Sequence, residues 1–250
     1  MSTTTDKDQT STKEEYWYPL ESDPTYWSDY LRSLTTGSSN GRYFIDIPSI
    51  DLVDEMGIFE CHNIIAYIFL YQMKSYQQLG TLEPLDSSNC RNLFFMRQFV
   101  HNSCGSVALF HAYINTIASD KLNGTDSLID RFYQENRDHT PEERGHSFAT
   151  NSLLKQLHHD VSLHGQSELP SDEQLSKIDY HYVAFIPLNG SIFELDGRKS
   201  LPIIHQNDDQ TQIDKDNFKR QALKIIKRYM QLDPNNLHYS LLALCTSSSS

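Results

Sequence analysis

The sequence predicts a single α/β domain, and three side-chain patterns support this fold class. Residues Asn63–Leu70 form a continuous apolar run of strand length, as expected for a strand that is covered on both faces. After Gly105, apolar side chains recur at helical spacing, which predicts a buried helix. Further along, Asn189-Gly190 separates two apolar runs and predicts a β-hairpin. No internal repeat or interior linker divides the 250 residues, so we expect one domain.

The N-terminal half predicts a helix followed by strands. Pro24 stands at a preferred first helical position, and the apolar spacing after it predicts a helix over 24–34. Strands are expected at Arg42–Ile47 and at Leu93–Met96, the second ending just before Gln98. The buried helix should follow that strand directly, so that the chain turns from strand into helix near Cys104.

The C-terminal half alternates further helices with the hairpin. One interior stretch, His158–Ile178, lacks any periodicity, and a loop of that length inside a compact domain is usually functional or disordered. The remaining elements are expected as helices at about 126–136, 142–157 and 214–230, hairpin strands at His181–Ile186 and Ser191–Leu195, and a last strand at His238–Cys245.

The two ends of the chain are too polar to pack. Residues 1–15 have no apolar side chain after Met1 and cannot offset the entropy of ordering, so we expect a disordered tail there. The folded domain should span 16–246, followed by a flexible C-terminal tail at 247–250.

The net charge limits the classes of partner. With 33 acidic residues against 21 Lys and Arg, the formal charge is −12, which disfavours nonspecific binding of nucleic acid or of an anionic membrane and favours a basic partner. The helix expected at 214–230 has a basic face, which either binds a polyanion or is the solvated side of a packed helix. Its apolar stripe, which includes Phe218 and Tyr229, favours the packed helix.

The sequence also indicates a cellular setting. No apolar run is long enough to span a membrane, and the N-terminus does not resemble a signal peptide. The four cysteines form no CxxC pair, so we expect free thiols in a cytoplasmic protein, with the nucleus as an alternative, and we expect a monomer.

Cys104 is the leading candidate for a nucleophile. It lies at the start of the predicted helix, where the helix dipole and free backbone N–H groups stabilise a thiolate and can also hold an oxyanion. The alternative is a structural cysteine that packs as a small hydrophobic residue, which is the common fate of a free cysteine.

The predicted hairpin supplies a base and an acid for this thiol. If Asn189-Gly190 is a two-residue turn, His181 and Asp196 are diagonal neighbours on one face, close enough for an imidazole to meet a carboxylate. Such a pair is the base and its orienting group in nucleophilic catalysis. The alternative is that Asp196 belongs only to a turn and that His181 is an ordinary residue at a strand edge.

Other polar residues near Cys104 are weaker candidates for a functional role. Gln98 precedes it by six residues, and its amide could stabilise an oxyanion or could simply be solvated. His111 lies on the apolar stripe and reads as a satisfied helix histidine rather than a base. Zinc binding through His101 and Cys104, or through His158-His159, would rest on incomplete ligand sets.

These residues carry a resemblance to a known family. The runs FMRQFVHNSCGSVALFHAYIN (Phe95–Asn115) and HYVAFIPLNGSIFELDG (His181–Gly197), together with PLESDP before the first helix, resemble the ubiquitin C-terminal hydrolases, a family of cysteine peptidases. The likeness runs in order from about Tyr18 to Cys245. It implies a central, mainly antiparallel sheet flanked by helices on both faces, a papain-like catalytic arrangement and a knotted chain.

The resemblance also implies an activity and its residues. Cys104 is then the nucleophile, His181 the general base and acid, Asp196 the group that orients His181, and Gln98 the oxyanion donor, with no metal or cofactor. An active-site crossover loop at about Leu157–Ile178 limits the leaving groups to small or unfolded ones. The partner is ubiquitin or a ubiquitin-like protein such as Nedd8, and a ubiquitin-binding module without turnover is the alternative from another class.

Overall fold

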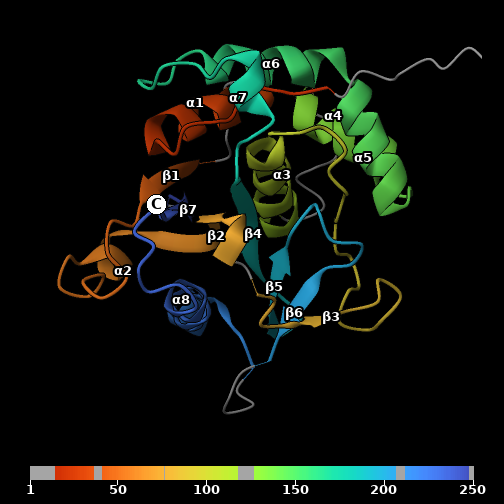
Figure 1. Ribbon diagram of the computed structural model, residues 1–250. Coiled ribbons are helices and arrows are strands. Elements are labelled where there is room, and N and C mark those ends of the chain that lie inside the picture. The colour runs from red at the N-terminus through yellow and green to blue at the C-terminus, as the bar shows by residue number, and fades with distance from the viewer. Residues whose placement is uncertain (1–14, 37–40, 76, 118–126, 207–211, 248–250) are drawn as a thin grey trace, which may run out of the picture.

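Figure 1 shows the computed structural model, in which helices cover both faces of a central β-sheet. The structure describes residues 15–36, 41–75, 77–117, 127–206 and 212–247. Within them, each neighbouring pair of strands is antiparallel, as the resemblance implied. The strands are β1 (Arg42–Asp46), β2 (Asn63–Gln72), β3 (Thr81–Leu82), β4 (Tyr180–Leu188), β5 (Ser191–Leu195), β6 (Ile203–His205) and β7 (Ser240–Thr246), in the sheet order β1-β7-β2-β4-β5-β6-β3.

The helices divide between two hydrophobic cores, one on each face of the sheet. Helices α1 and α3 to α6 pack on one face, and α2 and α8 pack on the other. None of the described helices is long and apolar enough to cross a membrane. Their bounds are α1 (Pro24–Leu34), α2 (Ile58–Cys61), α3 (Cys104–Thr116), α4 (Leu128–Asn136), α5 (Pro141–Thr150), α6 (Ser152–Ser162), α7 (Asp172–Leu175) and α8 (Lys215–Gln231), with a 3-10 turn at Met73–Ser75.

Strand β2 shows why one apolar run serves both cores. Its side chains alternate between the faces, so that Ala66 and Ile68 join the α3 side while Tyr67 and Phe69 join the α8 side. A strand buried on both faces needs apolar residues at consecutive positions, and the prediction of such a strand at Asn63–Leu70 is confirmed.

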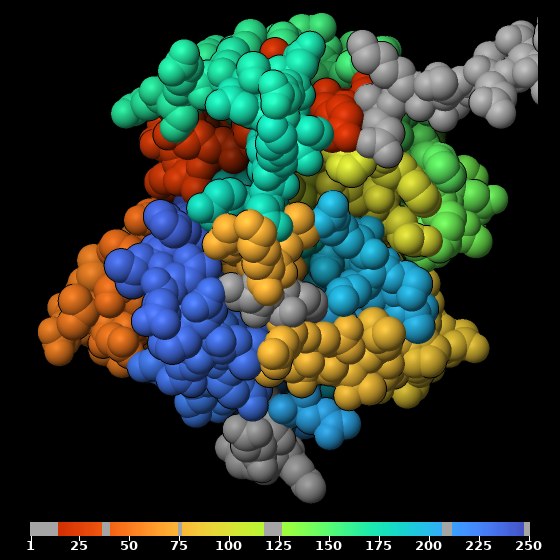
Figure 2. Space-filling model, in the orientation of Figure 1, coloured from red at the N-terminus to blue at the C-terminus, as the bar shows by residue number. Residues whose placement is uncertain are grey.

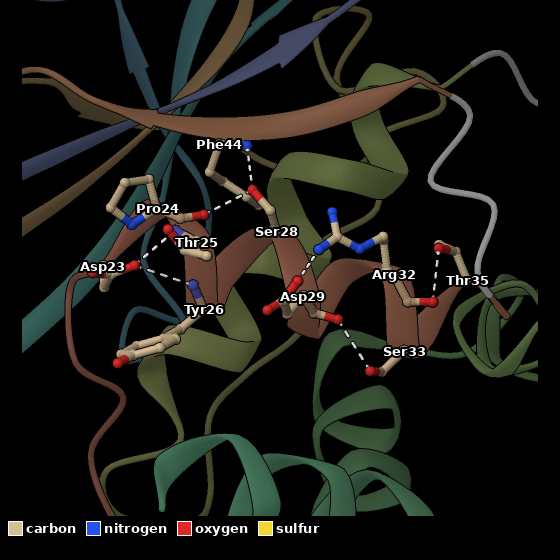
Figure 3. Close-up of polar contacts among 10 residues, drawn as sticks. All are labelled: Asp23, Pro24, Thr25, Tyr26, Ser28, Asp29, Arg32, Ser33, Thr35 and Phe44. Atoms are coloured by element: carbon tan, nitrogen blue, oxygen red, sulfur yellow. Dashed lines mark hydrogen bonds and ion pairs between the residues drawn. The ribbon is translucent and has the colours of Figure 1, made fainter. Parts of the chain in front are cut away.

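Helix α1 is fixed at its start and to the sheet by short polar side chains (Figure 3). The carboxylate of Asp23 accepts hydrogen bonds from the backbone N–H groups of Thr25 and Tyr26, which caps the helix. The hydroxyl of Ser28 donates to Pro24 O and accepts from Phe44 N at 2.9 Å, so it joins the helix to strand β1.

The prediction of a strand at Leu93–Met96 is wrong, because this segment pairs with no strand among the described residues. Side chains satisfy its backbone instead. Asn115 bonds both the N–H and the carbonyl of Phe94, and the N–H of Met96 donates to His111 Nε2 at 3.0 Å. The apolar run is buried as a strand would be, but polar groups of α3 take the place of a neighbouring strand.

Two other boundaries differ from the prediction. The helix expected at 142–157 is two helices, because the side chain of Asn151 caps the start of α6 at the residue where α5 ends. The stretch 158–178 is not irregular throughout, since α6 runs to Ser162 and α7 lies within it. The short elements α2, β3 and β6 were not predicted, and the tails expected at 1–15 and 247–250 fall mostly outside the described residues.

Candidate active site

Helix α3 begins at Cys104, so the thiol lies at the positive end of the helix dipole. The turn before it is closed by Ser103, whose hydroxyl donates to Val100 O at 2.9 Å. Cys104 is 8% exposed, and it belongs both to the core on the α3 side and to the lining of a pocket.

The hairpin places a histidine and a carboxylate together, as its register predicted. Ala184 pairs with Leu195 across β4 and β5, which brings His181 and Asp196 to the same end of the hairpin. His181 Nε2 and Asp196 Oδ1 are 2.6 Å apart, and both residues are buried. Asp196 Oδ1 also accepts from the backbone N–H of Arg198 at 2.8 Å, which fixes the carboxylate.

His181 and Asp196 form a buried ion pair. Burial would raise the pKa of Asp196, but the hydrogen bond and the charge of His181 outweigh burial and lower it, so the carboxylate stays ionised. It accepts the Nε2 proton, which leaves Nδ1 of His181 for the hydrogen bond with Cys104.

The thiol and the imidazole shift each other's pKa in opposite directions. Burial would raise the pKa of Cys104, yet the hydrogen bond and charge of His181, a hydrogen bond from the Tyr182 backbone and the charge of Arg198 lower it overall. Burial would lower the pKa of His181, but the hydrogen bonds to Asp196 and Cys104 raise it to about 9. The arrangement therefore favours a thiolate beside an imidazolium.

Tyr71 supports the imidazole from the neighbouring strand. It lies directly opposite His181 in the pairing of β2 with β4, and its ring meets the imidazole edge-on at a centroid distance of 5.9 Å. Burial and the nearby charges of Asp196 and Glu194 hold the pKa of Tyr71 well above its usual value. The hydroxyl therefore stays protonated, and the side chain that packs beside the imidazole is neutral. Sequence reasoning did not single out Tyr71, because its position follows from the β2–β4 pairing.

Gln98 lies beside the pair, two residues after the 93–96 segment and not at the end of a strand. Its backbone N–H donates to Gly197 O at 2.7 Å, and its Nε2 donates to Val100 O at 2.9 Å. Its Oε1 is buried and has no hydrogen-bond partner among the described residues. A Cβ added at Gly197 would come within 3.1 Å of Gln98 Cβ, so the close approach depends on glycine.

A pocket of about 320 Å³ opens onto these residues. Cys104, His181 and Gln98 line it together, whereas Asp196 lies behind His181 and does not reach the pocket. One wall is the end of the segment between α6 and β4, residues 163–179, which we call the crossover segment and which contains α7. In Figure 2 this segment runs down across the front of the molecule toward the strands.

The other candidates from the sequence do not form a second site. His111 is buried, its Nε2 accepts a hydrogen bond from Met96 N–H, and its Nδ1 lies 3.3 Å from Leu195 O. These contacts confirm a satisfied helix histidine, and burial lowers its pKa to about 4. Among the described residues, no group of three or more His, Cys, Asp or Glu side chains could hold a metal ion. His158 instead bonds Ser106 and the carbonyl of Tyr18.

A larger pocket, about 460 Å³, lies elsewhere, between the 92–94 segment and α4. Its buried Arg144 donates to the carbonyls of Phe95, Asn136 and Arg137, which is a structural role at the end of α4. The candidates Cys104, His181 and Gln98 line the smaller pocket instead.

The family model described as ubiquitin carboxyl-terminal hydrolase, family 1, matches residues 17–231, most of the folded chain. The chain belongs to this family. It is therefore a thiol hydrolase of the deubiquitinating class. The family likeness noted in the sequence is confirmed.

Curated relatives in the family match this chain along most of its length. A ubiquitin carboxyl-terminal hydrolase of Drosophila melanogaster is 30% identical over 91% of this chain and 96% of its own. Ubiquitin carboxyl-terminal hydrolase 3 of Arabidopsis thaliana is 27% identical over 94% of this chain and 96% of its own. Human ubiquitin carboxyl-terminal hydrolase isozyme L1 is 25% identical over 92% of this chain and 98% of its own.

A solved structure shares the fold. The catalytic domain of Trichinella spiralis UCH37, bound to ubiquitin vinyl methyl ester, superposes with a TM-score of 0.68 at 20% identity. The match covers 95% of this chain and 99% of that domain, which confirms the predicted α/β family fold.

Proposed function

We propose that Cys104 cleaves small or unfolded adducts from the C-terminal glycine of ubiquitin through a covalent acyl-enzyme. The observation that carries this proposal is the buried 2.6 Å contact between His181 and Asp196. The Cys104 thiol is hydrogen-bonded to the same imidazole. Such an arrangement supplies a nucleophile and a proton donor in one place.

The reaction proceeds in two steps of acyl transfer. The Cys104 thiolate attacks the carbonyl carbon of the glycine, and the resulting tetrahedral intermediate collapses as the carbon–nitrogen bond breaks. The His181 imidazolium gives its proton to the leaving amine. A water molecule, deprotonated by the now neutral His181, then attacks the thioester and releases ubiquitin with a free carboxylate. Asp196 keeps the imidazole oriented during both transfers.

Gln98 and the backbone N–H of Cys104 are proposed to hold the oxyanion. The Gln98 side chain lines the pocket beside the thiol, and its Nε2 uses one hydrogen for Val100 O. An amide nitrogen carries two hydrogens, so the second can donate to the developing charge.

The leaving group must pass the crossover segment. Residues 175–179 of this segment border the pocket that holds Cys104, so a folded adduct cannot approach the thiol while they keep this position. A short peptide or an unfolded chain needs a narrower passage, which supports the preference for such adducts.

A ubiquitin derivative with a C-terminal electrophile tests the proposal. The wild-type protein should gain the mass of one ubiquitin, whereas Cys104→Ala should gain none although it still binds ubiquitin. If the wild-type protein forms no adduct but binds ubiquitin, the chain is a binding module rather than an enzyme of this mechanism.

The modifier is proposed from the relatives, and the cellular setting from the thiols. The names of the relatives support ubiquitin, Nedd8 is the alternative, and parallel hydrolysis of the two C-terminal fluorogenic substrates discriminates between them. Cys61, Cys90, Cys104 and Cys245 are all free, which suits the reducing cytoplasm. Light scattering should find a monomer.

A further inference from the structure

The turn immediately before Cys104 has an unusual backbone. Asn102 has a φ of 63°, in the left-handed region that residues other than glycine seldom adopt and that asparagine tolerates best. Since α3 starts two residues later, the way this turn is held decides where the thiol lies.

The side chain of Asn102 bridges two parts of the chain that are far apart in sequence. Its Nδ2 donates to Trp17 O at 3.1 Å and to Leu175 O at 3.2 Å. The amide nitrogen has two hydrogens, and the two carbonyls use both of them. The hydrogen bond to Leu175 O also caps the C-terminal end of a short helix, because the last carbonyls of a helix have no partner within it.

The Trp17 side of this bridge is fixed. Trp17 is buried, and its ring packs against Phe148 and His158. The backbone N–H of Trp17 donates to His101 O at 3.0 Å, and the ring of Tyr16 stacks on the ring of His101 at a centroid distance of 4.6 Å. The N-terminal arm, residues 15–17, thus holds the turn from one side.

The Leu175 side belongs to the crossover segment. Leu175 is the last residue of α7, and the residues after it form the wall of the pocket. Any outward movement of this wall that carries α7 with it breaks the hydrogen bond to Asn102 and leaves the Leu175 carbonyl without that donor.

We propose that Asn102 is a positioning residue that couples the crossover segment to the turn carrying Cys104. This inference rests on the proposed function: when α7 is in place, the amide holds the turn and the thiol in register, and when an adduct displaces α7, the turn loosens. The Asn102 amide then affects both the selection of the leaving group and the alignment of the nucleophile.

Glycine at position 102 isolates the role of the amide. Because glycine adopts positive φ without strain, Asn102→Gly removes the two hydrogen bonds and keeps the backbone conformation. Asn92 provides a matched control, since it also has a positive φ, 67°, but lies at the larger pocket away from the thiol. Asn102→Asp is a second variant, which keeps the shape and replaces both donors by an acceptor.

Two measurements separate coupling from a purely local role. The first is hydrogen exchange in the peptide that contains α7, which needs no substrate. We expect exchange to be faster by about 3- to 10-fold in Asn102→Gly, the effect of losing one hydrogen bond, and unchanged in Asn92→Gly. The second is kcat/KM for ubiquitin carrying a small fluorogenic group and for ubiquitin carrying a folded domain.

The coupling predicts that the ratio of the rates for the two substrates changes. In Asn102→Gly, kcat for the small group should fall while KM changes little, because the thiol is less well aligned. The rate for the folded domain relative to the small group should rise about 3- to 10-fold, because α7 is displaced more easily. Asn102→Asp should change both readouts in the same direction.

The inference is overturned if Asn102→Gly matches Asn92→Gly in exchange and in the ratio of the two rates. A wild-type protein that forms no ubiquitin adduct would refute the proposed function alone, since hydrogen exchange still reports whether Asn102 holds α7.

Discussion

The acid–base chemistry of the site depends on a few contacts of His181. One ring nitrogen faces a carboxylate at 2.6 Å and the other faces the thiol, while the edge of Tyr71 closes one side. Because all of these groups are buried, each contact has a larger electrostatic effect than it would have in water.

Replacing Asp196 with Asn should lower turnover without abolishing reaction with a ubiquitin electrophile. The substitution removes the charge that raises the pKa of His181 to about 9. The imidazolium is the proton donor and is lost as pH rises through its pKa, so the alkaline limb of the kcat/KM profile should move below about pH 9. We expect kcat to fall by about 10²-fold, the scale of a misaligned acid–base group. A wild-type rate with an unchanged limb would argue against the orienting role.

Gly197→Ala should reduce both stability and kcat. The added Cβ would lie 2.9 Å from Val107 Cγ1 and 3.1 Å from Gln98 Cβ, so it must push the proposed oxyanion donor away from the thiol. Overpacking of this kind costs about 1–3 kcal/mol of unfolding free energy. Urea unfolding and steady-state kinetics measure the two effects.

Gly165→Ala is the matched control for this substitution. Its Cβ would lie 2.5 Å from Oε2 at the end of the Glu21 side chain and 3.5 Å from Glu21 Cβ, and Glu21 does not line the pocket that holds Cys104. If both variants behave alike, the close packing of Gly197 on Gln98 has no part in catalysis.

At the scale of whole elements, a chain of hydrogen bonds joins three helices beside the site. Tyr30 of α1 bonds Ser106 of α3 at 2.8 Å, and Ser106 bonds His158 of α6 at 2.7 Å. His158 Nε2 then donates to Tyr18 O, so its Nδ1 accepts from Ser106 and the ring is neutral.

Acid should weaken the fold through this neutral histidine. Burial lowers the pKa of His158 to about 4, as it does for His111, against about 6.5 in an unfolded chain. The unfolded state therefore binds more protons below pH 6.5, and the unfolding free energy should fall by about 2 kcal/mol per histidine between pH 7 and pH 5.

Urea unfolding at both pH values checks this prediction. His158→Gln should be less stable at pH 7 but lose about 2 kcal/mol less stability on acidification than the wild-type protein. An equal loss in both proteins would show that His158 is not neutral in the folded state.

The sequence predicted most of what local patterns control. The 24–34 helix and the hairpin followed from a helix-start proline, apolar spacing and Asn189-Gly190, because these signals act over a few residues. The 93–97 segment could not be distinguished from a strand, because what satisfies its backbone comes from Asn115 and His111 of a later helix. The break at Asn151 was missed because an asparagine within a helical pattern does not reveal that it caps a new helix.

The same distinction applies to the site. Cys104, His181 and Asp196 were predicted from a helix start and a hairpin register. The role of Asn102 in bridging two segments was not, because its partners lie 85 and 73 residues away in the chain.

At the scale of the whole molecule, ion pairs offset part of the basic charge of α8. Basic residues of α8 pair with carboxylates before α2: Arg220 contacts Asp54 at 2.7 Å and Lys227 contacts Asp51. With its apolar side packed in the core, α8 is the packed helix that the sequence favoured.

Association with ubiquitin should slow as salt concentration rises. The formal charge of −12 favours a basic partner through long-range attraction, which is screened over about 8 Å at physiological ionic strength. Stopped-flow measurements with Cys104→Ala from 50 to about 500 mM salt should show a falling association rate and a nearly constant dissociation rate. A salt-independent association rate would mean that net charge does not guide the encounter.

The position of β7 in the sheet bears on how the chain is made. This strand lies between β1 and β2, although it is the last strand along the described chain. During synthesis, β1 therefore cannot pair until Ser240–Thr246 has left the ribosome. Until then, β2 also lacks one of the two strands that it pairs with. The sheet is complete only after the other described strands have been made, and the edges of β1 and β2 that pair with β7 stay open in the meantime.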